Sequence, residues 1–331
     1  MPEPTVEQFQ GCLIGCAVGD AVGAPVEAHG PESVEPYIKN MVRPRAFSGV
    51  QIRDKYDFGQ YTDDTQLTRE LAISLVEHGS LDPEAWGERI ADMFKNKRMV
   101  GYGNATKNAA LRLAAKCPWE HSGEPHPSAG NGSAMRAAPI GLAFYDSTLS
   151  SLATAAKIQG FVTHQSDQAS AGAAAIASAV ALGMQVDEVE PLRFLKTVSS
   201  VVKKIDPRFA DYVLLIPTMM DEGDDAVVEW CRTFQEGDKW PGISPYVISS
   251  VLWALYSFVK TPESFWETII TSITPGGDVD TTAAMAGAIS GARVGLKGIP
   301  EDVAKLVNDK GEHGYDFLCD LGSKLYEQFY E

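Results

Sequence analysis

The chain has 331 residues, of which 44% are hydrophobic and 22% are charged, and its formal net charge is −16 at pH 7. These proportions are typical of a globular protein with a substantial core. The negative charge argues against nucleic-acid binding, because phosphate backbones are bound by clustered Lys and Arg side chains. An anionic small molecule is still compatible, since backbone N–H groups and metal ions also neutralise phosphate.

The cysteines and the apolar stretches indicate the setting of the protein. There are five cysteines, with no Cys-x-x-Cys pair and no Cys/His spacing typical of a zinc site, so we expect free thiols in a reducing compartment. The first residues lack the pattern of a signal peptide. The apolar stretch at residues 169–184 is too short and too weakly hydrophobic to span a bilayer. We therefore expect a cytoplasmic protein that binds no membrane. We also expect it to be a monomer.

Helical periodicity and capping signals recur along the whole chain. Gly11, Gly15, Gly19 and Gly23 stand four residues apart, so they would line one face of a helix and let another element pack closely. Further helices are predicted at residues 67–78, from 83 onward, and at 108–116, 150–159, 168–184, 191–204, 245–259, 262–272, 281–294 and 314–330. Residues 41–43 and 50–52 are weak strand candidates. The sequence thus predicts an all-α fold, with residues 1–331 forming one compact orthogonal helical bundle.

Two carboxylates lie in or just after the glycine-rich helix. Asp20 is embedded in a segment suited to burial, where a carboxylate needs a partner, and we interpret it as a structural hydrogen-bond acceptor. Glu27 follows Pro25 at the exit of that helix. It is the better candidate for a functional site.

Two acidic clusters far apart in the chain carry most of the functional information. Thr62-Asp63-Asp64-Thr65 runs into a helix, and Asp278-Val279-Asp280-Thr281 follows two glycines and runs into another. An N-cap explains one Asp or Thr at such a place, but not two adjacent aspartates between two threonines. Carboxylate and hydroxyl oxygens are the ligands that hard divalent cations prefer. If the fold brings the clusters together, they form a site for Mg²⁺ or Mn²⁺.

Three further segments are candidates for binding a ligand. Gly101-Tyr102-Gly103-Asn104 precedes a predicted helix, and Asn131-Gly132-Ser133 follows a long stretch without periodicity. Plain turns are the commoner interpretation, but helix N-termini preceded by glycines also bind anions. His164 stands before a helix of small residues. A lone histidine is more often a structural hydrogen-bond partner than a functional group.

Taken together and in this order, these segments resemble the ADP-ribosylglycohydrolase family. The resemblance spans roughly residues 8–298. It implies an all-α fold with a cleft that holds two divalent cations, Mg²⁺ or Mn²⁺. It also implies hydrolysis of the glycosidic bond between ADP-ribose and a modified acceptor, which is either a protein side chain or a small ADP-ribosyl compound.

The resemblance also implies roles for individual residues. The metal ligands would be the oxygen-bearing side chains of the two clusters, Thr62, Asp63, Asp64, Asp278, Asp280 and Thr281. The catalytic carboxylate would be Glu27, Asp63 or Asp64. The substrate would be held by Glu27 and by the three binding segments, namely Gly101, Tyr102, Gly103, Asn131, Gly132, Ser133 and His164, with Ile243 and Tyr246 near the adenine.

One departure from the family and two rival functions remain. Certain arginine-directed members place an aspartate in the loop after Gly-Tyr, whereas this loop reads Gly103-Asn104-Ala105-Thr106. The type of linkage cleaved is therefore left open. The rivals are a non-catalytic relative that binds ADP-ribose or is purely structural, and a Mg²⁺-dependent phosphohydrolase.

Overall fold

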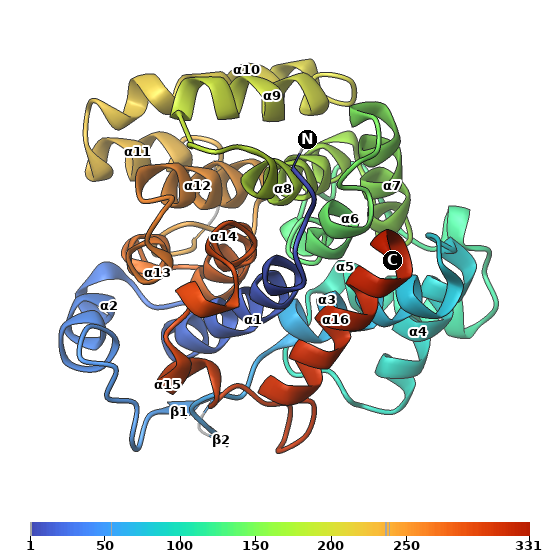
Figure 1. Cartoon of the computed structure of the whole chain (residues 1–331), viewed down its shortest axis with the longest axis horizontal. Helices are drawn as coiled ribbons and strands as arrows, with labels where there is room; N and C mark the ends of the chain where they lie inside the picture. Colours follow the sequence, from blue (N-terminus) through green and yellow to red (C-terminus); the bar gives the residue numbers. More distant parts are fainter. Residues whose placement is uncertain (1, 54, 236, 238) are drawn as a thin grey trace.

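The computed structural model describes residues 2–53, 55–235, 237 and 239–331, and the fold in these ranges is all-α, as predicted (Figure 1). The α-helices are α1 (Val6–Gly23), α2 (Pro31–Tyr37), α3 (Asp63–His78), α4 (Pro83–Lys95), α5 (Asn104–Ala114), α6 (Ala138–Ala143), α7 (Leu149–Phe161), α8 (Asp167–Gln185), α9 (Pro191–Val202), α10 (Pro207–Met220), α11 (Asp224–Arg232), α12 (Val247–Lys260), α13 (Phe265–Ile273), α14 (Val279–Val294), α15 (Glu301–Ala304) and α16 (Tyr315–Tyr330).

Strands are short in the described part of the chain. β1 (Gln51–Ile52) pairs antiparallel with β2 (Tyr56–Asp57), and β3 (Glu124–Pro125) pairs parallel with β4 (His164–Gln165). The second pair matters for the site because it fixes the backbone of His164 against the long segment before Asn131.

The central pair of helices, α1 and α14, packs almost backbone to backbone (Figure 1). A Cβ atom added at Gly11, Gly15 or Gly19 would lie closer than 3.0 Å to backbone atoms of α14. The partners move backwards along α14 as α1 advances, from Gly291 through Gly287 to Ala283, so the helices are antiparallel. The predicted glycine face is therefore confirmed, and its partner is α14.

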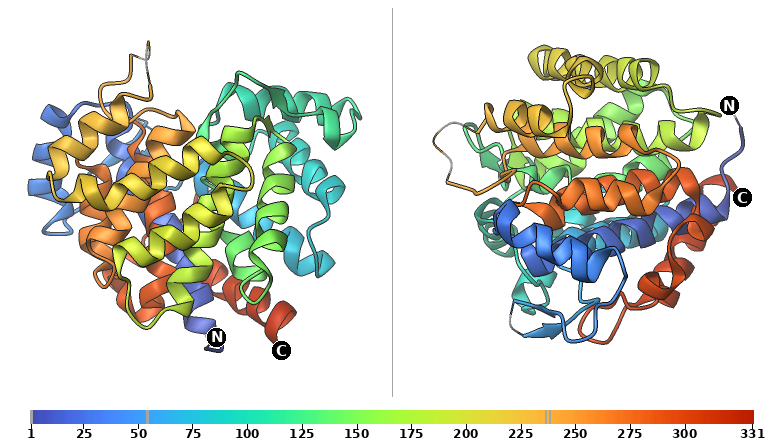
Figure 2. Two further views of the ribbon diagram at one scale, coloured as in Figure 1. Left: turned by 90° about the horizontal axis from the view of Figure 1, so that it is seen from above. Right: turned by 90° about the vertical axis from the view of Figure 1, so that its left-hand side faces the viewer.

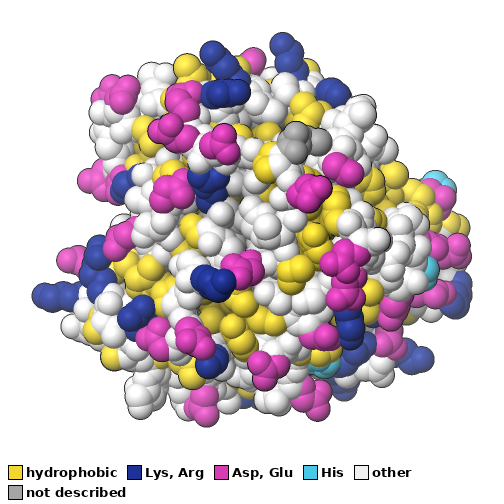
Figure 3. Space-filling model, in the orientation of Figure 1, with side chains coloured by type: hydrophobic (Ala, Val, Ile, Leu, Met, Phe, Trp, Pro, Cys, Tyr) yellow, Lys and Arg dark blue, Asp and Glu magenta, His cyan; other side chains and the backbone are white. Residues whose placement is uncertain are grey.

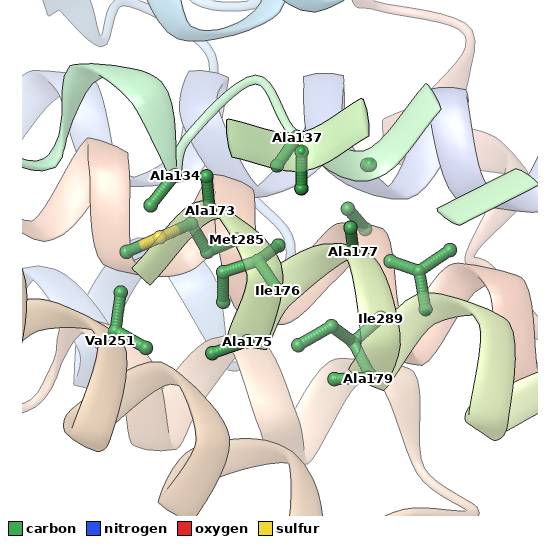
Figure 4. Packing of buried hydrophobic residues seen from close by; sticks show 14 of the residues in the cluster. Ala134, Ala137, Ala173, Ala175, Ile176, Ala177, Ala179, Val251, Met285 and Ile289 are labelled. Carbon is green, nitrogen blue, oxygen red and sulfur yellow. The ribbon is translucent and has the colours of Figure 1, made fainter. Parts of the chain in front are cut away.

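The main core lies around α8. Its small residues, among them Ala173, Ala175 and Ala177, leave room for larger side chains of neighbouring helices, such as Met285 of α14 and Val251 of α12 (Figure 4). Burial of the apolar surface of this core is the main favourable contribution to the free energy of folding. The small residues let α8, α12 and α14 come close enough to share one core.

The remaining helices cover this centre on all sides, as the two further views show (Figure 2). The two chain ends meet at the end of α6: the Tyr145 hydroxyl donates to the Pro2 carbonyl, and the Tyr330 hydroxyl donates to the Leu142 carbonyl. On the face shown in Figure 3, acidic side chains lie among basic ones and do not form a single patch.

Most predicted helices are present within a few residues, and the exceptions have local reasons. Residues 41–43, a weak strand candidate, are not a strand: Ile38–Val42 is a π-helical turn that continues from α2. Residues 50–52 contribute only the two-residue β1. The prediction omitted five helices, α2, α6, α10, α11 and α15. For α10 a signal was present, because Asp206 caps it before a proline as Asp82 caps α4.

The apolar stretch at residues 169–184 is not, as the sequence had suggested, the longest of the chain. Among the described residues, Val6–Val26 is long and apolar enough to cross a membrane, and it is longer than the stretch at 169–184. In this fold, 89% of its apolar window is buried. Its hydrophobicity is accounted for by packing against α14 and α16.

Candidate active site

A cavity of about 640 Å³ opens where the end of α1 meets the starts of α3 and α14. Five carboxylates line it, and we call them the acidic cluster: Glu27, Asp63, Asp64, Asp278 and Asp280. Thr281 also lines the cavity. The fold therefore brings together the two acidic motifs that the sequence singled out.

Asp20 fixes the start of α3 within this site. Its carboxylate accepts hydrogen bonds from the backbone N–H of Thr62 at 2.9 Å and of Thr65 at 3.1 Å. It also accepts from the hydroxyl groups of both threonines, at 3.0 and 2.6 Å. Asp20 thus has the structural role expected from the sequence. Because Asp63 and Asp64 lie between its two partners, Asp20 sets their position.

The start of α14 is fixed in a similar way by a neighbouring segment. The Asn131 side-chain N–H₂ donates to Asp278 at 2.6 Å, and the Thr281 hydroxyl donates to the other Asp278 oxygen at 3.3 Å. The Thr281 backbone N–H donates to Asp280 at 2.9 Å. Carboxylates at a helix N-terminus are also favoured by the helix dipole. Asp278 and Asp280 are therefore held rigidly.

Glu27 joins the carboxylates of α14. One carboxylate oxygen from each of Glu27, Asp278 and Asp280 lies within 4.8 Å of the others, a spacing that suits one metal ion. Glu27 also accepts a hydrogen bond at 2.6 Å from Arg53, a cavity-lining residue that the sequence analysis missed. Arg53 stands in a turn beside β1, and no local pattern marks it as functional.

The crowding of carboxylates is reflected in their proton affinities. Burial, with Asp20 and Glu27 nearby, raises the pKa of Asp63 to about 7. Burial first, and then neighbouring carboxylates, raise the pKa of Asp64 and Asp280 well above the usual range. Carboxylates at such positions are stable as anions only if positive charge balances them.

The donor set fits divalent cations. Asp64 Oδ1 is buried and has no hydrogen-bond partner, so it offers a free lone pair inside the cluster. The hydroxyl groups of Thr62 and Thr281 donate their protons to carboxylates, which leaves oxygen lone pairs available for a cation. An all-oxygen set of this kind is typical of Mg²⁺ or Mn²⁺ sites.

Two loops and a histidine complete the wall of the cavity. Gly101, Tyr102 and Gly103 line it before α5, and Gly132 lines it together with His164. A Cβ atom at Gly101 would lie 2.8 Å from an Asp63 oxygen. Gly101 also has a φ of 79°, a backbone conformation that favours glycine where this loop passes the acidic cluster.

Four predicted site residues do not line the cavity. The Thr62 hydroxyl lies behind the cavity wall, 3.0 Å from Asp20 and 3.1 Å from Asp64 of the acidic cluster, and the Ser133 hydroxyl donates to the Ala169 carbonyl at 2.9 Å. Ile243 is fully buried and acts through its backbone, whose carbonyl accepts from the Asp278 N–H at 2.7 Å. Tyr246 is half-buried at the start of α12, and its neighbour Pro245 lines the cavity instead. Besides Arg53 and Pro245, the wall contains residues that the sequence analysis did not single out, among them Ser128, Met135 and Trp240.

Comparisons with known proteins agree with this architecture. The family model described as ADP-ribosylglycohydrolase matches residues 1–331. An uncharacterized protein of Archaeoglobus fulgidus is 32% identical over 321 residues, which cover 97% of this chain and 96% of that protein. The ADP-ribosylhydrolase ARH3 of Mus musculus is 30% identical, with 90% of this chain and 86% of the relative aligned.

A bacterial enzyme and a solved structure extend the comparison. The ADP-ribosylarginine hydrolase Tri1 of Pseudomonas putida is 27% identical, over 91% of this chain and 74% of that protein. A structure titled ADP-ribosylglycohydrolase-related protein complex superposes with a TM-score of 0.72 at 24% identity. The superposition covers 98% of both chains and supports the fold.

Proposed function

Because this chain belongs to the ADP-ribosylglycohydrolase family, we propose that it hydrolyses the glycosidic bond that joins ADP-ribose to a modified acceptor, with release of ADP-ribose. The observation that supports this most is the convergence of the five carboxylates of the acidic cluster in one cavity of about 640 Å³. Relatives named ADP-ribosylhydrolase and ADP-ribosylarginine hydrolase support the same class of reaction.

We propose that Thr62, Asp63, Asp64, Asp278, Asp280 and Thr281 hold two divalent cations, Mg²⁺ or Mn²⁺. When bound, such cations would neutralise the acidic cluster and lower the pKa of a water molecule. The free Asp64 oxygen and the raised pKa values of the buried carboxylates support this proposal.

Side chains and loops of the chain accept the proton and bind the substrate. One carboxylate of Glu27, Asp63 or Asp64 takes the proton of the attacking water as the bond to the acceptor breaks. Each of them lines the cavity, so each is within reach of a bound substrate. The loops at 101–103 and 131–132, with His164, bind the diphosphate and the ribose. They carry backbone and side-chain donors, which suit an anionic ligand without a basic cluster.

A product assay tests the proposal. The purified protein is incubated with ADP-ribosylated peptides of serine and arginine linkage and with a small ADP-ribosyl compound, with and without EDTA. We expect intact ADP-ribose from at least one substrate by mass spectrometry, loss of turnover in EDTA, and recovery with Mg²⁺ or Mn²⁺. Release of AMP or phosphate would indicate a phosphohydrolase instead.

A variant separates catalysis from binding alone. Asp280→Ala removes one carboxylate of the group formed with Glu27 and Asp278. We expect near-complete loss of turnover, with the fold retained by circular dichroism. Binding of ADP-ribose without turnover of any linkage by the wild type would show a non-catalytic relative.

A further inference from the structure

Three buried polar side chains form a chain of hydrogen bonds behind the cavity wall. The Arg136 guanidinium donates from Nη2 to Thr163 Oγ1 at 2.7 Å, and Thr163 Oγ1 lies 2.7 Å from His164 Nδ1. Arg136 and Thr163 are fully buried, and His164 is 3% exposed. None of these three residues belongs to the acidic cluster, so metal binding does not explain their hydrogen bonds.

Arg136 is held firmly at the inner end of this chain. Its Nε donates to the Gln159 side-chain oxygen at 3.1 Å, and its Nη2 also donates to the Gln159 carbonyl at 3.2 Å. The guanidinium lies over the Trp86 ring, 5.3 Å from its centre. Burial lowers the pKa of Arg136 to about 9, so the group is still a cation at neutral pH. A guanidinium only donates, and therefore Thr163 Oγ1 accepts from it.

Either Thr163 or His164 could supply the proton of the hydrogen bond between them. The Thr163 hydroxyl has one proton and two acceptors near it, His164 Nδ1 at 2.7 Å and the Gly160 carbonyl at 3.4 Å. The Gly160 carbonyl already accepts the Thr163 backbone N–H at 3.0 Å. Donation from Arg136 also polarises the hydroxyl and makes it a better donor. The proton therefore points to Nδ1.

This assignment fixes the state of the imidazole. If Nδ1 accepts, the proton of a neutral imidazole lies on Nε2. The ring is neutral because burial, with the positive charge of Arg136, lowers the pKa of His164 to about 3. Nε2 lies 3.6 Å from the position of a Cβ at Gly130 and 3.0 Å from that of a Cβ at Gly132, on the wall of the cavity. The N–H therefore faces the 130–132 turn.

We propose that Thr163, supported by Arg136, is a positioning residue that holds His164 as the Nε2–H tautomer, a hydrogen-bond donor for an acceptor oxygen of the bound ligand. The tautomer follows from the buried contacts alone. Only the identity of the ligand, an ADP-ribosyl group with its diphosphate and ribose oxygens, rests on the proposed function. A histidine with the opposite tautomer would present a lone pair to these oxygens and repel them.

Nitrogen-15 NMR of histidine-labelled protein tests the tautomer directly. In the wild type we expect Nε2 to carry the proton and Nδ1 to be unprotonated at pH 7, in the free protein and with ADP-ribose. Thr163→Ser keeps the hydroxyl and should keep this spectrum. Thr163→Val has nearly the same shape but cannot donate, so it should give the Nδ1–H form or a mixture.

Affinity for ADP-ribose gives a second measurement. In Thr163→Val, binding should weaken as the fraction of the Nε2–H form falls, by roughly tenfold when that fraction is about one tenth. Thr163→Ser should stay within about threefold of the wild type. A wild-type spectrum of the Nδ1–H form, or a Thr163→Val protein with unchanged spectrum and affinity, would overturn the proposal. If Thr163→Val fails to fold, Thr163→Ala, which also lacks the hydroxyl, replaces it in both measurements. Absence of turnover together with the expected tautomer would contradict the proposed function and leave this inference standing.

Discussion

Because α1 and α14 pack so closely, a single methyl group added at their contact should lower the stability of the protein. In Gly15→Ala, the new Cβ would lie closer than 3.0 Å to the carbonyl oxygen of Gly287. That oxygen belongs to the backbone of a buried helix and cannot rotate away. The helices must therefore separate by about 1 Å to restore an ordinary contact distance of about 3.5 Å.

Two opposing effects determine how much Gly15→Ala changes the free energy of unfolding. Overpacking a rigid core costs about 3 kcal/mol at the upper end of its usual range. Replacing glycine by alanine within a helix returns about 1 kcal/mol. We therefore expect Gly15→Ala to lower the free energy of unfolding by about 2 kcal/mol.

Gly183 supplies a matched control on another buried helix. It lies in α8, and a Cβ there would find its nearest neighbour, the Ile289 carbonyl oxygen, at 3.6 Å, an ordinary contact. Gly183→Ala should thus raise the free energy of unfolding by about 1 kcal/mol through helix propensity alone. Urea denaturation of both variants and the wild type, followed by circular dichroism, measures the difference. Equal stabilities, or a Gly15→Ala protein more stable than the wild type, would refute the packing argument.

Three further predictions concern charges in and near the site. Asp20→Asn places an N–H₂ group against donors such as the Thr65 hydroxyl, so we expect the free energy of unfolding in urea denaturation to fall by about 2–4 kcal/mol. Turnover should also be reduced. An unchanged protein would show that the hydrogen bonds of Asp20 are dispensable. The pKa of His164 is about 3 when folded, so the unfolded state binds more protons below pH 6.5 and the histidine destabilises the fold as pH falls from there towards 3. Between pH 7 and pH 5, the free energy of unfolding of metal-free His164→Gln should therefore fall by about 2 kcal/mol less than that of the wild type, as measured in denaturation titrations. Parallel pH profiles of the two proteins would contradict this. Arg53→Ala removes a cation beside the acidic cluster, so Mn²⁺ should bind about fourfold more tightly, as measured by calorimetry. Arg45→Ala, which breaks an exposed ion pair with Asp302, is the control and should not change the affinity. Equal Mn²⁺ affinities for both variants would argue against an electrostatic role of Arg53.

The acidic cluster could be predicted because its signals are local. Asp63 and Asp280 each stand at the start of a helix whose periodicity is visible in the sequence, and more carboxylates are present than capping requires. Their meeting in space was predicted from the kind of ligand that divalent cations need and from the family resemblance. The structure supplies the physical cause, since both helix starts contact the last turns of α1.

Other parts of the site could not be found in the sequence because they depend on contacts between distant segments. Arg53 reaches Glu27 from a turn that has no periodicity. Ile243 was predicted to lie near the adenine, but it does not line the cavity and contacts the start of α14 through its carbonyl group, an interaction that any residue type could make and that the sequence therefore does not reveal. His164 was recognised as a candidate, but its proposed tautomer depends on Thr163 and on Arg136, which reaches Thr163 from a distant segment and is held there by Gln159.

The same helix, α1, supports both the stability of the protein and the geometry of the site. Asp20, near its end, binds the start of α3, and one turn later a Cβ at Gly23 would lie 2.5 Å from the backbone of Asp280. Glu27 follows after the 3-10 turn Ala24–Val26. The relative positions of the carboxylates from three segments are thus set by the distance between α1 and α14. Since that distance is fixed by backbone contact and not by flexible side chains, a change such as Gly15→Ala, made two turns away from the cavity, should weaken Mn²⁺ binding as well as folding.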